Sequence, residues 1–155
     1  MILRKDSVPV TEGVSGYPEP FSLGRGFLSY RPLSEAGGLT QFGVALETLH
    51  PGRQSSQPHW EQHEDEFLYM LDGALTVVED GVEAVIHPGD ACCWKAGDPV
   101  AHTLRNHTDR PAVYLIAGSR DPRNICHYPG LDLIATPHGF THLDGTPYPT
   151  KGETE

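Results

Sequence analysis

The sequence predicts an all-β domain, a barrel or sandwich of short strands. Three observations support this class. The 155 residues include 14 Pro and 17 Gly, which makes turns frequent and disfavours long helices. Short runs rich in β-branched and aromatic residues recur between these turns. Two Asp-Gly pairs, at 72–73 and 80–81, each follow such a run, and this pair is a strong hairpin signal. At this length we expect one domain, residues 1–155, with its own core.

The expected elements follow from these signals in chain order. Residues 1–26 are rich in Gly, Pro and Ser and predict an extended N-terminal arm. The barrel should occupy 27–119, and 120–155 should form an irregular C-terminal tail with a charged end, anchored by Tyr128, Phe140 and Tyr148. Residues 41–49 alternate large apolar with small or polar residues, the pattern of a half-buried strand. Further strands are expected at 27–33, 66–72, 74–78, 82–86, 91–94, 100–105 and 111–118, with a loop at 34–38.

Composition excludes several classes of partner. The formal net charge is −10, from 21 acidic and 11 basic residues, so phosphates of nucleic acids or anionic membranes would be repelled. No apolar run approaches the roughly 20 residues of a membrane helix, and residues 1–6 do not begin a signal peptide. The three cysteines form no Cys-x-x-Cys pattern. We expect them to be small apolar core residues in a reducing cytoplasm.

The residues with metal-binding chemistry gather in 58–73. His59 and Glu61 are two apart, so in a strand they share a face. Glu66 has the wrong parity for the same strand, but a loop over 62–65 would place it on the facing strand. His102 lies on a later strand. Each residue alone has an ordinary explanation as a surface or hydrogen-bonded side chain. The combination predicts a metal site of His59, Glu61, Glu66 and His102, with open positions for a ligand.

Several neighbouring residues are weighed against this set. His63 shares the parity of His59 and is a rival ligand, although we expect it to cap the loop from outside. Glu64 and Asp65 are interpreted as solvated loop charges. The remaining histidines have no supporting spacing. Two imidazoles and two carboxylates suit a divalent transition metal, namely Zn, Mn, Fe or Ni.

The spacing of these residues resembles the two motifs of the cupin superfamily. Gly52, His59, Glu66 and Gly73 fall on the first motif, and Gly89, Asp90, Gly97, His102 and Asn106 fall on the second. The tail, with His127-Tyr128-Pro129-Gly130 and Thr141-His142-Leu143-Asp144, is similar to that of small bacterial single-domain cupins. The resemblance implies a double-stranded β-helix (jelly-roll) barrel that forms a homodimer and holds one metal inside.

The sequence departs from the family pattern at three points. Six residues separate Gly52 from His59, Lys95 stands where proline is usual, and Glu61 stands where the family has its second histidine. Carried over residue by residue, the ligands are His59, Glu61, Glu66 and His102. Alternatively, Glu61 swings away and leaves a two-His, one-carboxylate set, which is compatible with non-haem iron.

Three functions are compatible with these residues. The first is an enzyme whose metal binds a small oxygen-rich ligand (a sugar, sugar phosphate or carboxylate), with isomerisation or oxygen-dependent cleavage as the reaction. The second is a non-catalytic module that binds or senses a small molecule. The third is a barrel that has lost its metal, which would leave inward carboxylates without a counter-charge. A phosphate would need a cation near the barrel mouth, for which Arg53, Lys95 and Arg105 are candidates.

Overall fold

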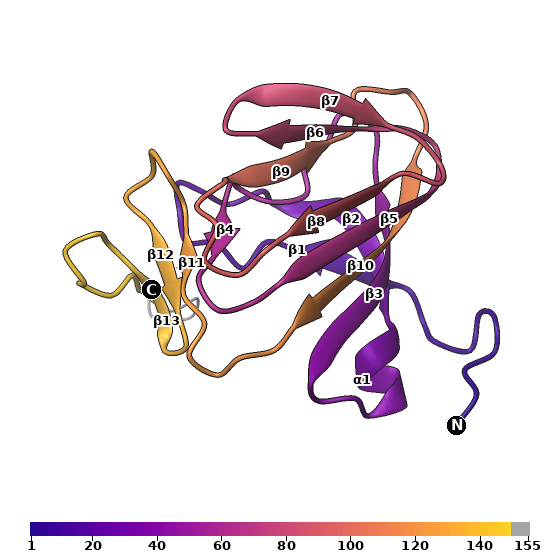
Figure 1. The fold of residues 1–155 in the computed structure, drawn as a ribbon, viewed down its shortest axis with the longest axis horizontal. Helices are drawn as coiled ribbons and strands as arrows, with labels where there is room; N and C mark the ends of the chain where they lie inside the picture. The colour runs from indigo at the N-terminus through magenta and orange to yellow at the C-terminus, as the bar shows by residue number, and fades with distance from the viewer. Residues whose placement is uncertain (150–155) are drawn as a thin grey trace.

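The computed structural model describes residues 1–149, so the charged end expected at 150–155 lies outside the described residues. Strands of three antiparallel sheets dominate the described part, as expected for an all-β chain (Figure 1). Their bounds, with those of one short helix, are β1 (Thr11–Val14), β2 (Arg25–Pro32), α1 (Leu33–Gly37), β3 (Phe42–Leu49), β4 (Trp60–Glu61), β5 (Glu66–Asp72), β6 (Leu75–Glu79), β7 (Val82–Ile86), β8 (Ala91–Trp94), β9 (His102–Arg105), β10 (Ala112–Ser119), β11 (Cys126–His127), β12 (Ile134–Thr136) and β13 (Gly139–Thr141).

The largest sheet has the strand order β1-β2-β3-β10-β5-β8, and the second has the order β7-β6-β9. Figure 1 shows the smaller sheet lying over the larger one. Alternate residues of the large sheet face inward, and Leu49, Leu68, Met70 and Tyr114 are fully buried there. Leu75, Val77 and Leu104 of the small sheet complete the same core. The two sheets therefore enclose one apolar interior.

Turn chemistry sets the register of the β6–β7 hairpin. Glu79 pairs with Val82 across a two-residue turn. Asp80 and Gly81 in that turn have φ values of 47° and 83°. Two consecutive left-handed residues are what the favoured hairpin turn requires, and Asp and Gly tolerate them best. The turn expected at this Asp-Gly pair is confirmed.

Three segments differ from the expectations. Residues 34–38 were expected to form a loop, but Leu33–Gly37 form the helix α1, which ends at Gly38 in the left-handed conformation. Strand β9 begins at His102 instead of residue 100. Within the N-terminal arm, β1 pairs with β2 at the edge of the large sheet. Local periodicity does not reveal these elements because tertiary pairing, not alternation, stabilises such short segments.

The C-terminal segment adds a third sheet, with strand order β13-β12-β11-β4. Figure 1 shows it beside the open end of the barrel. Its aromatic side chains pack with the arm, as the ring centroids of Tyr17 and Tyr128 lie 5.5 Å apart and those of Phe21 and Tyr148 lie 6.2 Å apart. Through the pairing of β11 with β4, the tail is hydrogen-bonded to the strand that precedes the acidic loop. Within residues 1–149, no helix has the length and apolar character that a membrane crossing needs.

Candidate metal centre

Backbone pairing brings the two predicted histidine ligands together. The amide of His59 donates to the carbonyl of His102 at 3.1 Å, and the amide of His102 donates to the carbonyl of His59 at 2.9 Å. Residues that exchange both hydrogen bonds lie directly opposite each other, so their side chains leave the same face. The ring centroids of the two histidines are 4.8 Å apart. One β-bridge therefore brings together two histidines that lie 43 residues apart in the sequence.

Glu66 reaches the two imidazoles from the opposite sheet. It is the first residue of β5 and pairs with Gly118 of β10 and Trp94 of β8. Its Oε2 atom lies 3.3 Å from Nε2 of His102 and 3.8 Å from Nε2 of His59. Donor atoms of these three residues all lie within 4.8 Å of one another. The acidic loop does reset the strand parity, and Glu66 bridges the two walls of the barrel.

The triad has donor atoms that could hold a divalent metal ion. Nδ1 of His59 lies 2.9 Å from the carbonyl oxygen of Gln57, and Nδ1 of His102 lies 3.4 Å from that of Val100. A carbonyl only accepts, so Nδ1 of each ring carries a proton, and Nε2, which faces Glu66, is the nitrogen that a metal would take. Around an ion with bonds of about 2.1 Å, adjacent donors lie about 3.0–3.4 Å apart. The two distances from Glu66 Oε2, 3.3 and 3.8 Å, are close to this range, and the two imidazole donors lie within 4.8 Å of each other.

The surroundings hold the triad in place. The indole of Trp94 stacks on His102 with a centroid distance of 3.9 Å and an interplanar angle of 6°, and its Nε1–H donates to Glu79 at 2.8 Å. Burial pushes the pKa of Glu66 upward, but the hydrogen bond with His102 and the charges of both imidazoles outweigh it. The pKa of Glu66 therefore lies below its ordinary value, and the carboxylate form is favoured.

Glu61 lies beside His59 but outside the group formed with Glu66 and His102. One carboxylate oxygen is 3.9 Å from Nε2 of His59, and the other accepts a short hydrogen bond from the Asn124 amide. Glu61 forms a second group of metal-binding side chains with His59 and Cys126, and the donor atoms of these three residues also lie within 4.8 Å of one another. The four predicted residues thus fall into two triads that share His59.

The residues of the acidic loop have structural partners. The His63 ring contacts Gln62 and belongs to neither triad. Glu64 and Asp65 are more engaged than solvated loop charges. Glu64 is half-buried and accepts from the amide of Asp121 at 2.7 Å, and Asp65 accepts from the amide of Ala96 at 2.8 Å. These bonds tie the loop to the tail and to the turn after β8.

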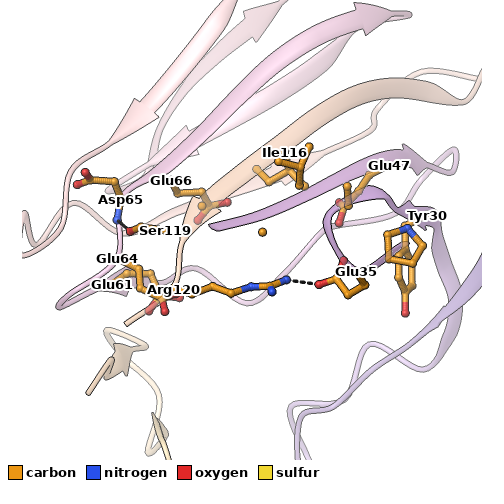
Figure 2. A pocket seen from close by; sticks show the side chains of 15 residues that line it. Tyr30, Glu35, Glu47, Glu61, Glu64, Asp65, Glu66, Ile116, Ser119 and Arg120 are labelled. Atoms are coloured by element: carbon orange, nitrogen blue, oxygen red, sulfur yellow. Dashed lines mark hydrogen bonds and ion pairs between the residues drawn. The ribbon is translucent and has the colours of Figure 1, made fainter. Parts of the chain in front are cut away.

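A cavity of about 560 Å³ leads from Glu66 to the surface between β2, β3 and β10. Figure 2 shows the guanidinium of Arg120 reaching across it to Glu35. Gly43 and Gly118 leave room here, since a Cβ on Gly43 would lie 3.4 Å from the guanidinium. Among the described residues that line the cavity, Arg120 is the only cation, and the carboxylates are Glu35, Glu47, Glu61, Glu64, Asp65 and Glu66.

Sequence reasoning missed three residues of this region. Glu47 accepts a 2.7 Å hydrogen bond from the Tyr114 hydroxyl inside the barrel, and burial raises its pKa. A glutamate on the inward parity of an otherwise apolar strand was the available signal. Arg120 lies one residue beyond β10 and had no local signal. Cys126 was expected to be a core residue like the other cysteines, and it is buried, whereas Cys93 is exposed. All three thiols are free.

Of the three cations considered for phosphate binding, only Lys95 lines a cavity next to the triad. Arg105 pairs with Glu83 at 3.5 Å on the outside of the small sheet. Lys95 lines a smaller cavity of about 220 Å³ together with Glu66 and His102. Arg53 lines none of the cavities around the triad.

Comparison with known proteins establishes the family. A family model described as the cupin domain matches residues 45–118. A sugar phosphate isomerase of the cupin superfamily from Silicibacter pomeroyi is 37% identical, with 97% of this chain and 98% of that chain covered and a TM-score of 0.87. The chain therefore belongs to the cupin superfamily, and its barrel is the double-stranded β-helix of that family.

Two further crystal structures share the fold. A putative sugar phosphate isomerase from Acidithiobacillus ferrooxidans is 26% identical over 76% of each chain, with a TM-score of 0.70. A predicted oxalate decarboxylase from Thermotoga maritima is 21% identical, with 77% of this chain and 98% of that chain covered and a TM-score of 0.61. Among curated proteins, none matches the chain.

Proposed function

We propose that this cupin binds a divalent transition metal through His59, Glu66 and His102, with Glu61 as a neighbouring carboxylate. At that metal it binds a small oxygen-rich molecule and isomerises it. The observation that carries the proposal is the convergence of three donor atoms within 4.8 Å, one of them on a residue that also lines the 560 Å³ cavity. The metal would supply Lewis acidity toward a ligand carbonyl or hydroxyl.

Glu47 is the proton carrier in this proposal. Isomerisation between an aldose and a ketose moves a proton between adjacent carbons, so it needs a group that alternately holds and releases one. Burial raises the pKa of Glu47, and such a shift moves a carboxyl toward the range where it carries protons near neutral pH. Glu47 lines the same cavity as Glu66. The Tyr114 hydroxyl orients it by donating to Oε2.

The charge of the cavity favours an uncharged polyhydroxy ligand over a phosphate ester. Six carboxylates line it, and its single described cation, Arg120, is already paired with Glu35. A divalent ion and a protonated Glu47 leave the lining net negative, which repels a phosphate dianion. A sugar presents neutral hydroxyl groups that donate to these carboxylates. The relative from Silicibacter pomeroyi, a sugar phosphate isomerase, supports the reaction class.

The test uses protein loaded separately with Mn, Zn, Fe or Ni. Each form is incubated in deuterated water with aldoses, ketoses and their phosphate esters, and NMR follows isomerisation and deuterium uptake at the carbon beside the carbonyl. Glu47→Gln should slow turnover by about 10²–10⁴-fold, and the matched change Glu83→Gln, on the outer surface, should not. Ligand-induced thermal stabilisation without turnover in every metal form would instead support a non-catalytic binding module.

One observation favours a second candidate function. His59, Glu66 and His102 are two imidazoles and one carboxylate, the set used by non-haem iron oxygenases. We therefore also propose oxygen-dependent cleavage as the alternative activity of the iron-loaded protein. Oxygen consumption that requires Fe(II) and an organic acid or polyol would support it. Equal oxygen consumption by the His102→Ala variant would exclude it.

We further propose that the chain forms a homodimer through the outer face of the large sheet. Phe67, Tyr69 and Leu71 alternate along β5 and are 38%, 40% and 44% exposed. On the neighbouring strand, Leu115 lies opposite Tyr69. A contiguous apolar face of this kind favours burial against a second protein surface.

A further inference from the structure

Cys126 lies in β11 of the third sheet, outside the two sheets of the barrel. It pairs directly with Glu61 across β11 and β4, and opposite residues on paired strands present their side chains on one face. The residue is 6% exposed. Its sulfur, a carboxylate oxygen of Glu61 and a ring nitrogen of His59 all lie within 4.8 Å of one another. Three different metal-binding side chains therefore meet at the junction of the barrel and the third sheet.

The surroundings of this group suit a cation. Its members line a cavity of about 670 Å³ between the barrel and the tail, and Glu66 is not among the residues that line it. The thiol sulfur lies within 4.8 Å of a carboxylate oxygen of Glu61. A cation bound to both would take the place of the thiol proton, which passes to solvent, and leave a thiolate beside a positive charge. Thiolate ligands select thiophilic ions such as Zn²⁺, Co²⁺ and Cd²⁺.

We propose that His59, Glu61 and Cys126 form a second cation position, taken by thiophilic ions, beside the position formed by His59, Glu66 and His102. Nδ1 of His59 is engaged by the Gln57 carbonyl, so only Nε2 is free to ligate. Because that nitrogen binds one ion at a time, the two positions exclude each other, and each chain holds one ion. The inference rests on the proposed metal function, since His59 belongs to both positions.

The simpler explanation for a buried cysteine is that it fills space in an apolar core. Cys126 does pack against Tyr128 and Leu133. That role requires neither a carboxylate nor an imidazole beside the sulfur. Cys92 and Cys93 belong to no group of metal-binding side chains within residues 1–149. The two explanations therefore differ in one respect, whether sulfur binds an added ion.

The experiment titrates Co²⁺ into the metal-free full-length protein and records its absorption spectrum. A thiolate on cobalt gives an intense near-ultraviolet charge-transfer band, whereas nitrogen and oxygen donors give only weak visible bands. We expect the band in the wild-type protein and in the control Cys93→Ser. Cys126→Ser should lose the band but still bind one cobalt ion per chain through the first position. His102→Ala should keep the band, and His59→Ala should bind no cobalt at either position.

The outcomes separate this inference from the function on which it rests. Cobalt binding without the band in the wild-type protein, or with an unchanged band in Cys126→Ser, overturns the second position and leaves the first intact. No binding of cobalt, zinc or manganese by the wild-type protein overturns both. Should Cys126→Ser fail to fold, X-ray absorption of the cobalt-loaded wild-type protein decides, because a metal–sulfur distance of about 2.3 Å differs from about 2.1 Å for nitrogen or oxygen.

Discussion

The double variant His59→Ala/His102→Ala should lose the divalent ion that we propose for the wild-type chain. The two histidines contribute two of the three donors of the first triad, and His59 is common to both triads. Without the histidines, Glu66 is left alone in the first triad and Glu61 with Cys126 in the second, which are too few donors to hold the ion against water. Metal analysis of protein purified without added metal should therefore give one ion per wild-type chain and none in the variant.

Thermal unfolding supplies the magnitude. An ion at one hundred times its dissociation constant stabilises the folded state by about 2.7 kcal/mol. For a chain of this size, each kcal/mol raises Tm by roughly 2–4 °C. Adding metal should thus raise the wild-type Tm by about 5–11 °C and leave that of the double variant unchanged. His102 is 3% exposed, so the variant also starts from a lower Tm, and the metal-dependent increment is the quantity to compare.

His63→Ala is the matched control, because His63 lies in the adjacent loop and belongs to neither triad. It should retain both the ion and the full increment in Tm. An increment in the double variant equal to that of the wild-type protein would refute the assignment of the site. So would loss of the ion in His63→Ala alone.

Three further predictions concern the cavity, the core and the outer face. Glu35→Gln frees the Arg120 guanidinium for a charge-assisted bond worth about 1.5–3 kcal/mol. Calorimetry should show phosphate esters binding roughly tenfold tighter or more, and the gain should vanish in Glu35→Gln/Arg120→Gln. Asn106 is 1% exposed and donates to two backbone carbonyls at 2.9 and 2.8 Å. Asn106→Ala should cost about 3 kcal/mol in denaturant unfolding, and a loss below about 0.5 kcal/mol would contradict this. Tyr69→Glu should convert a dimer to a monomer in sedimentation with metal content unchanged, and a persistent dimer would place the interface elsewhere.

The strands of the barrel could be predicted because each carries its own signal. Val82–Ile86 and Ala91–Trp94 begin and end where the sequence predicts, since turn residues bound them closely. The elements that were missed have no such signal. Cys126–His127 is a two-residue strand that exists because β4 and β12 flank it, and α1 is a single turn closed by Gly38.

The residues of the candidate site also differ in whether a local sequence signal predicted them. The cupin spacing identified His59, Glu66 and His102, whose separations along the chain reflect the lengths of strands and turns. The position of the Glu61 carboxylate depends on Asn124, which lies 63 residues away in the sequence and donates a hydrogen bond to it. Glu47 lines the cavity because the register of β3 turns it inward, and Arg120 lines it because it follows the end of β10. Their partners, Tyr114 and Glu35, are distant in the sequence.

By itself the amino-acid sequence determined the all-β class, the approximate positions of the main barrel strands and the histidines and carboxylates with metal-binding chemistry. These properties depend on alternation, turn residues and spacing, which act over a few residues. Only the tertiary structure decided that the donors fall into two groups around His59, that the tail pairs with β4, and that six carboxylates share one cavity with one arginine. Contacts between residues far apart in the chain arise from the packing of whole sheets, and no local pattern encodes them.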